Sequence, residues 1–205
     1  LKEGLWLAQG HISLYMLTIE QGTRYFDLQQ AGKLTLPNED LAADFYELTQ
    51  ELTASAGLPA YEISNHALPG QESRHNMLYW RYGEYAGIGP GAHGRLMINN
   101  QRHATAAEKL PFDWQKKVQA QGHGMVVDDV LTWEEQGDEF LVMGLRLKEG
   151  ISPARFTAIS GRQISVRQID ALKGYGFVET LSNGNIRVTD KGFPVLDAVV
   201  ADLAA

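Results

Sequence analysis

The stretch HNMLYWRYGEYAGIGPGAHG, residues 75–94, carries the most unusual composition in this chain. It combines a His-Asn pair and a cluster of aromatic residues with glycines at positions 87, 89, 91 and 94. Neither a plain helix nor a plain strand favours that mixture. Glycine permits positive φ and allows another group to approach the backbone closely. We therefore expect the chemistry of the protein, if it has any, to lie in this stretch.

The segment GPGAHG, residues 89–94, formally satisfies the dinucleotide-binding pattern G-x-G-x-x-G. That pattern binds a pyrophosphate only where a helix begins directly after it. The following residues 95–102, RLMINNQR, show no apolar helical period. The sequence therefore argues against a dinucleotide site.

The residues H-N-x-x-Y-W at the start of the stretch allow two interpretations. His75 and Tyr79 are four residues apart, as are Asn76 and Trp80, so a helix would present two adjacent stripes. The stripes could close a hydrophobic core, with His75 as a hydrogen-bonded core histidine. Alternatively, a flat hydrophobic ligand could lie against Tyr79 and Trp80, with His75 as an imidazole donor to a metal or an acid group. Sequence alone leaves both open.

Four ordered segments carry a resemblance to a known family. They are HISLYMLTIEQGT (11–23), YEISNHALPG (61–70), HNMLYW (75–80) and YAGIGPGAHGR (85–95). Together they resemble the C-terminal half of the oxygen-independent coproporphyrinogen III oxidase-like radical SAM proteins. The pair YEISN and H-N-x-x-Y-W resembles the HemW-type haem chaperone branch of that family, and the resemblance extends from Leu5 to the C-terminus.

The resemblance implies an α/β fold. We expect the C-terminal part of a partial (β/α) radical SAM barrel, followed by a mostly helical, winged-helix-like domain. It also implies S-adenosyl-L-methionine and a [4Fe-4S] cluster bound by a C-x-x-x-C-x-x-C motif. This chain contains no cysteine and begins with Leu1. We therefore expect a fragment of a longer protein, which alone lacks the cluster ligands for radical chemistry.

The same resemblance implies the site residues. Haem would contact His75, Asn76, Tyr79 and Trp80, with His75 as the iron ligand. Our own inference adds Arg74 and Arg81 as partners for the propionates. The residues expected to border the cofactor and substrate cavity are Tyr15, Glu20, Glu62, Asn65, Gly87, Gly89, Gly91 and His93. For three of them a plain alternative stays open: Glu62 in an ion pair, and Asn65 or His93 capping a turn.

The pattern of apolar residues predicts the elements. Residues 12–19 form a near-continuous apolar run, typical of a parallel strand buried on both faces. A helix is expected after Asn38, and short strands at 61–64 and 85–89. We expect the barrel half at 1–104, a connector at 105–125 and the helical domain at 126–205. That last part should begin with a capping box at Thr132 and Glu135. It should continue with a helix from Pro153, a helix at 164–173, a hairpin around SNGN (182–185) and a final helix.

The composition limits the function. The leading hypothesis is haem binding and transfer to apo-haemoproteins, and the alternative is coproporphyrinogen III oxidase activity in the parent protein. A winged-helix nucleic-acid module is less favoured, because residues 151–205 hold six Lys and Arg against five acids and the hairpin tip has no basic residue. We expect no integral membrane segment and a cytoplasmic location, since no signal peptide or long apolar run occurs. The exposed edges of a half barrel favour a homo-oligomer.

Overall fold

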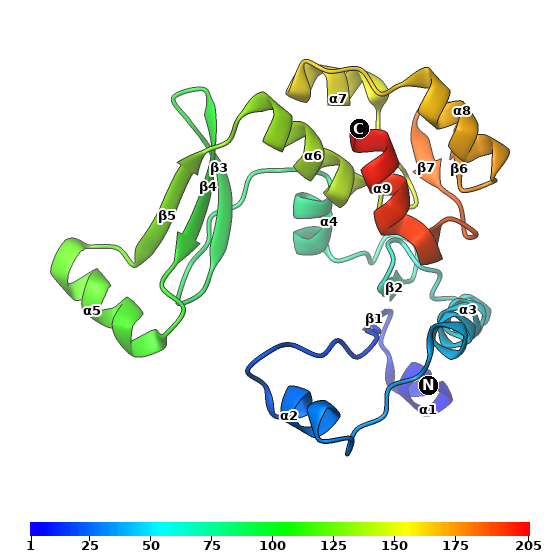
Figure 1. Ribbon diagram of the computed structural model, residues 1–205, viewed down its shortest axis with the longest axis horizontal. Helices are drawn as coiled ribbons and strands as arrows, with labels where there is room; N and C mark the ends of the chain where they lie inside the picture. Colours follow the sequence, from blue (N-terminus) through cyan, green and yellow to red (C-terminus); the bar gives the residue numbers. More distant parts are fainter. The chain divides into compact units, whose positions relative to one another are not determined.

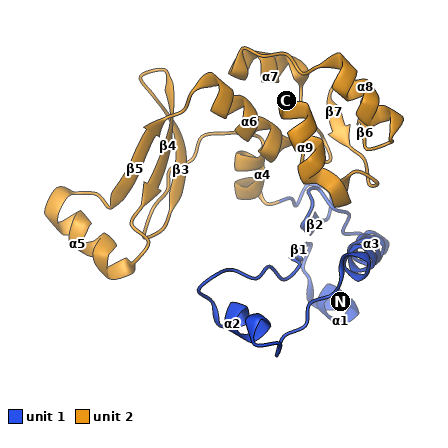
Figure 2. Cartoon of the chain, in the orientation of Figure 1, with its two compact units in different colours: residues 1–72 blue, residues 73–205 orange.

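A computed structural model describes all residues 1–205 (Figure 1). The chain divides into two compact units, Leu1–Glu72 and Ser73–Ala205 (Figure 2).

The first unit combines helices with one small sheet. Its elements are α1 (Lys2–Leu7), β1 (His11–Ser13), α2 (Arg24–Gln30), α3 (Glu39–Ser55) and β2 (Asn65–Ala67). Helix α3 begins as predicted, because the Asn38 side chain accepts the Leu41 N–H at 2.9 Å. The chain leaves this helix through Gly57, whose φ of +78° suits glycine.

The predicted strand over residues 12–19 is wrong in its extent and in its pairing. Strand β1 covers only His11–Ser13 and pairs antiparallel with β2, with Ile12 opposite His66. Beyond it, Tyr15, Met16 and Leu17 are 74%, 57% and 55% exposed. An apolar run is buried on both faces only where strands and helices flank it. Here β2 is the only strand beside it, and it is three residues long.

The predicted strand over residues 61–64 is also displaced. The ladder begins at Asn65, and residues 61–64 form bends. The buried Glu62 carboxylate explains the shift, because it accepts the Ser64 N–H at 2.6 Å. A side chain that captures a nearby backbone N–H competes with strand pairing.

The second unit contains the remaining elements (Figure 1). They are α4 (Arg74–Trp80), β3 (His93–Ile98), β4 (Gln101–Ala107), α5 (Pro111–Gln121), β5 (Met125–Val130), α6 (Trp133–Gly144), α7 (Pro153–Ser160), α8 (Val166–Gly174), β6 (Val178–Thr180), β7 (Ile186–Val188), the 3₁₀ helix η1 (Phe193–Val195) and α9 (Leu196–Ala204). The strands form two antiparallel sheets, β3-β4-β5 and β6-β7.

Strand β3 follows the glycine-rich stretch directly. Asn99 and Asn100 make the two-residue turn to β4, with φ of +51° and +61°. Asparagine tolerates this left-handed conformation better than most residues, and such turns suit hairpins. Strand β3 continues past Gly94, so the prediction that no helix begins there is confirmed. Residues 85–89 contribute only an isolated bridge, Tyr85 to Arg95, in place of the predicted strand.

The core of this unit lies among the helices α6, α7, α8 and α9 and the hairpin β6-β7. Its most deeply buried apolar side chains are Phe140, Leu141, Leu145, Leu147, Ile151, Phe156, Val178, Ile186, Val188, Phe193 and Val199. Helices α6 and α7 approach closely at Gly137, where a Cβ atom would lie 2.5 Å from Cβ of Ser160. The core explains why the apolar positions of α6 recur at helical spacing.

The predicted order of two helices, a hairpin and a final helix is present in α7, α8, β6-β7 and α9. Its interpretation as a winged-helix domain stays a prediction. Residues 105–125, expected to connect two domains, hold the end of β4, all of α5 and the first residue of β5. The three domain boundaries also stay predictions. None of the helices has the length and apolar character needed to cross a membrane.

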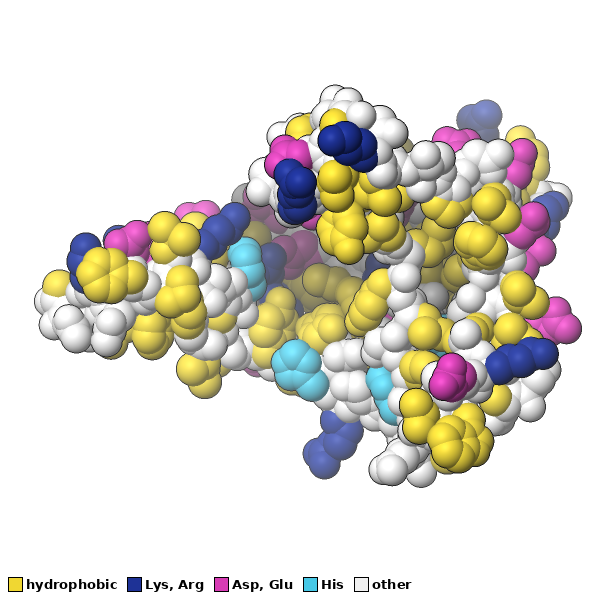
Figure 3. Space-filling model, turned by 90° about the horizontal axis from the view of Figure 1, so that it is seen from below, with side chains coloured by type: hydrophobic (Ala, Val, Ile, Leu, Met, Phe, Trp, Pro, Cys, Tyr) yellow, Lys and Arg dark blue, Asp and Glu magenta, His cyan; other side chains and the backbone are white.

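Strand β5 forms an exposed edge of its sheet. All six of its residues are exposed, including Met125 and Val126 at 40% and 50%. Hydrophobic side chains are visible on the arm that β3, β4, β5 and α5 form (Figure 3). Such an edge offers unpaired backbone groups to another chain. The homo-oligomer expected from the sequence stays a prediction.

The capping box of α6 gives a first testable prediction. The Thr132 hydroxyl accepts the Glu135 N–H, and the Glu135 carboxylate accepts the Thr132 N–H at 2.8 Å. Replacing Thr132 with Ala should lower the free energy of unfolding by about 1 kcal/mol. Denaturant unfolding followed by circular dichroism measures this loss. Thr132→Ser keeps the hydroxyl, so equal stabilities of the Ala and Ser variants would contradict the role of the cap.

The same cap should respond to acid. Hydrogen bonds from the Thr132 N–H and hydroxyl hold the pKa of Glu135 below its ordinary value of 4.5. A lowered pKa in the folded state gives stability that is present above that value and is lost as the pH falls below it. The difference between wild type and Thr132→Ala should therefore shrink in acid.

Candidate functional site

Helix α4 presents the aromatic residues of the H-N-x-x-Y-W stretch. Its cap is Ser73, whose hydroxyl accepts the Asn76 N–H at 3.3 Å. The rings of His75 and Tyr79 lie one turn apart and meet edge to face, with centroids 5.4 Å apart. Tyr79 also contacts Trp80 at 4.6 Å between centroids. The helical spacing inferred from the sequence is confirmed.

These rings form one wall of a cavity of about 510 Å³. Its lining comes from α4, the loop after it, the start of β3 and helix α6: His75, Tyr79, Trp80, Tyr85, Ala86, Gly87, Ile88, Ala92, His93 and Met143. The volume falls in the range of small-molecule and cofactor sites. The lining is mostly apolar and aromatic, with two imidazoles, two phenols and one thioether as its possible metal ligands.

Gly87 and Gly94 are required because two backbone segments lie too close together there for a Cβ atom. Tyr85 and Arg95 exchange backbone hydrogen bonds of 2.8 and 2.9 Å. Within this bridge, a Cβ atom on Gly87 would lie 2.5 Å from the His93 carbonyl oxygen, and one on Gly94 would lie 2.9 Å from the Gly87 nitrogen. Real Cβ atoms do not approach that closely. Glycine here permits one segment to lie against the other, and the loop backbone becomes a cavity wall.

The other two glycines of the loop lie outside the lining. Gly89 and Gly91 have φ of +102° and +69°, and the Gly91 N–H donates to the Glu108 carbonyl oxygen at 2.8 Å. They shape the turn between Ile88 and β3. Their part in cofactor binding stays a prediction.

The predicted residues of the first unit lie in two places. Tyr15 lines an apolar cavity of about 380 Å³ together with residues of α3. Asn65 donates to the buried Glu62 carboxylate at 2.7 Å and accepts the Ser13 hydroxyl. Glu20 is exposed, and its carbonyl oxygen accepts the Thr23 hydroxyl at 2.6 Å. The second cavity is therefore accompanied by a buried polar network, and cofactor contact by these residues stays a prediction.

The cations beside α4 differ in their availability. Arg81 donates two hydrogen bonds of 2.7 Å to the Glu149 carboxylate, so its charge is already balanced. Arg146 lies over the Trp80 ring, 4.4 Å from its centroid. Arg74 is exposed at the first position of α4, next to His75. Of the two arginines inferred from the sequence, Arg74 is the better placed to bind an anionic ligand.

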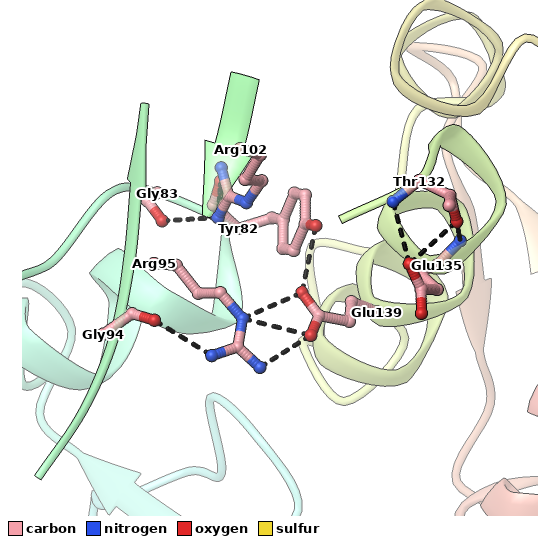
Figure 4. Close-up of polar contacts among 8 residues, drawn as sticks. All are labelled: Tyr82, Gly83, Gly94, Arg95, Arg102, Thr132, Glu135 and Glu139. Atoms are coloured by element: carbon pink, nitrogen blue, oxygen red, sulfur yellow. Dashed lines mark hydrogen bonds and ion pairs between the residues drawn. The ribbon is translucent and has the colours of Figure 1, made fainter. Parts of the chain in front are cut away.

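A polar cluster beside the cavity was missed by sequence reasoning (Figure 4). The Tyr82 hydroxyl donates to the Glu139 carboxylate at 3.0 Å, and Arg95 donates to the same carboxylate from both Nε and Nη2. The Arg102 guanidinium lies 3.7 Å from the centroid of the Tyr82 ring and donates to the Gly83 carbonyl oxygen. The four side chains come from three distant segments, and no spacing in the sequence links them.

Tyr82 has an unusual backbone conformation. It is only 5% exposed and has a φ of +56°, which an aromatic residue rarely adopts. Strained residues of this kind persist where their surroundings fix them, often at ligand sites. Burial raises the pKa of the phenol above its ordinary value of 10.0. The hydrogen bonds to Glu139 likewise raise the pKa of Arg95.

Nowhere in the chain do three or more His, Cys, Asp or Glu residues come together as a metal site. A metal that brings its own ring of nitrogen ligands needs only one or two from the protein. The indole N–H of Trp80 is buried and has no hydrogen-bond acceptor. Buried polar groups are normally paired, so this N–H is an exception in the structure.

Comparisons with known proteins agree with one another. Residues 131–195 match the family model described as the HemN C-terminal domain. The chain is 35% identical to Radical S-adenosyl methionine domain-containing protein 1, mitochondrial, of Danio rerio, over 98% of this chain and 47% of that protein. It is 33% identical to Heme chaperone HemW of Lactococcus lactis, over 89% of this chain and 47% of that protein.

A solved structure shares the fold. The structure titled "Coproporphyrinogen III oxidase (HemN) from Escherichia coli is a Radical SAM enzyme." matches all of this chain and 50% of its own, with a TM-score of 0.69 and 15% identity. At that identity the match describes the fold alone. The chain spans about half the length of the curated relatives it matches.

The buried phenol gives a prediction about alkaline stability. A pKa raised in the folded state gives stability that is present below the ordinary value of 10.0 and is lost as the pH rises through the raised value. Wild type should therefore lose stability above pH 10.0 more steeply than Tyr82→Phe, which has no phenol at this position. Thermal unfolding measured across alkaline pH tests this. Tyr175→Phe, at an exposed tyrosine, is the control, and parallel curves for all three proteins would contradict the assignment.

Proposed function

Because this chain belongs to the HemN/HemW-like radical SAM proteins, as a C-terminal region of that family, we propose that its aromatic cavity binds haem. We propose further that the whole protein passes the haem to apo-haemoproteins. The observation that carries the proposal is the convergence of His75, Tyr79 and Trp80 on one cavity with the glycine loop and Met143.

Each wall of the cavity has a role in this proposal. A neutral imidazole is a good ligand for haem iron, and His75 is exposed at the start of α4 where iron can reach it. Tyr79 and Trp80 supply flat aromatic faces against which a porphyrin packs. Asn76 lies on the same helix outside the lining, where its N–H completes the cap with Ser73.

The edge of the porphyrin carries carboxylates and needs polar partners. Arg74 lies next to His75 and presents an exposed cation. The unpaired indole N–H of Trp80 offers a further donor. The cavity would therefore hold a porphyrin by its apolar faces and orient it by one charge.

The family implies S-adenosyl-L-methionine and a [4Fe-4S] cluster in the whole protein. Such clusters are held by cysteine thiolates, and this chain has no cysteine. The cluster ligands would therefore come from outside these residues. Coproporphyrinogen III oxidase activity is the alternative for the whole protein, and the haem titration below bears on it.

A haem titration followed by Soret absorbance tests the proposal. His75→Ala should raise the haem dissociation constant about tenfold or more, because it removes the iron ligand. His103→Ala is the matched control, since His103 lies on β4, is paired with Asp128 at 2.7 Å and is outside the cavity. Protoporphyrin without iron should bind wild type and His75→Ala alike. Unchanged haem affinity in His75→Ala would exclude His75 as the iron ligand, and coproporphyrinogen turnover would be measured next.

The proposed role of Arg74 gives a separate prediction. Arg74→Ala should weaken haem binding about two- to fivefold, the modest effect expected of an exposed charge. Haem with esterified propionates should bind wild type and the variant equally. Arg167→Ala, an exposed arginine near the start of α8, should change neither affinity. An equal loss with both ligands would exclude the propionate contact.

A further inference from the structure

Helix α6 meets the cavity on the same face that carries Glu139. Met143, which lines the cavity, lies one helical turn after Glu139. The next residue, Gly144, packs against Ile151 and faces the backbone of Trp80, since a Cβ on it would lie 2.4 Å from Cγ2 of Ile151 and 4.0 Å from the Trp80 carbonyl oxygen. A displacement of α6 at Glu139 would therefore also move Met143 in the cavity wall.

The Glu139 carboxylate is bound by the two segments that build the opposite walls. Tyr82 follows α4 by two residues, and its hydroxyl reaches Oε2 of Glu139. Arg95 follows His93 by two residues, and its guanidinium reaches both carboxylate oxygens at 2.7 to 3.1 Å. Arg95 also holds Tyr85 through the paired backbone hydrogen bonds. One carboxylate of α6 thus joins the segment that follows α4 to strand β3 (Figure 4).

The ion pair between Arg95 and Glu139 is partly shielded from solvent. The side chains of Arg95 and Glu139 are 19% and 23% exposed. Partial burial weakens solvent screening, and a bidentate arginine fixes direction as well as distance. Three other arginine–glutamate or arginine–aspartate pairs, at Arg81, Arg162 and Arg187, are all more exposed.

We propose that Glu139 is a positioning residue for the haem cavity: its carboxylate holds Tyr82 in the left-handed conformation and holds Arg95 against α6, and so sets the distance between the cavity walls. This inference rests on the proposed haem binding. Glu139 itself does not line the cavity, so it acts through the residues that do.

The test compares Glu139→Gln with Glu179→Gln in the 205-residue chain. Glu179 pairs with Arg187 across the hairpin β6-β7, away from the cavity lining, and makes a matched control. Glutamine keeps the size of the side chain and removes its charge. Hydrogen exchange of the ligand-free proteins, read by mass spectrometry of peptides, reports on the walls directly. Haem titration reports on the consequence for binding.

In Glu139→Gln we expect faster exchange in residues 82–95 and 139–145 with no change in β6 and β7, and a haem dissociation constant raised about tenfold. Glu179→Gln should show neither effect. Tyr82→Phe, which removes one of the bonds to Glu139 and keeps the ring, should show the same pattern with a smaller change. It also serves as the second variant if Glu139→Gln fails to fold.

Two results would overturn the inference. The first is a Glu139→Gln variant whose hydrogen exchange and haem affinity equal those of wild type. The other is faster exchange throughout residues 73–205, which would make Glu139 a general stabilising residue. If wild type binds no haem, the proposed function falls, while localised exchange in Glu139→Gln would still support the positioning of the walls.

Discussion

The structure of the second unit depends on one close approach of the chain to itself. Tyr85 and Arg95 pair through their backbones, and residues 86–94 between them fold back so tightly that only glycine fits at 87 and 94. This pairing places the loop against the first residues of β3. It also directs Arg95 toward α6 and Tyr85 toward α4. The cavity is the space that these constraints leave between the aromatic face of α4 and the loop.

Sequence reasoning predicted the parts whose signals are local. The caps at Asn38 and Thr132, the Asn-Gly hairpin turn and the helical spacing of His75 and Tyr79 each depend on residues within a few positions of one another. The sequence assigned His75 to haem and His93 to the cofactor cavity or a turn cap, and the structure places both in the lining of one cavity. The family resemblance supplied the haem interpretation, which the composition alone could not.

The wrong or missing predictions concern interactions that the local sequence pattern does not determine. The run at 12–19 is apolar enough for a buried strand, but whether it becomes one depends on which strands lie beside it. At 61–64 the Ser64 N–H donates to the Glu62 carboxylate and not to a neighbouring strand. Sequence reasoning assigned Met143 and Glu139 no role in the site, because both occupy ordinary positions of an amphipathic helix. A residue that lines a cavity and a residue that packs in a core fit the same helical periodicity. A partly buried ion pair between distant segments leaves no periodic signal in the sequence.

The edge strand β5 has a consequence for how the protein behaves in solution. Its first half, Met125 to Val127, is apolar and offers free backbone groups, while Asp128 and Asp129 place negative charge on the second half. Charge on an edge strand discourages a second edge from docking, and the net charge of −7 acts in the same direction. Added salt screens both effects. Concentrated stocks should therefore keep best at low ionic strength, and scattering that grows with salt would be the sign of edges coming together.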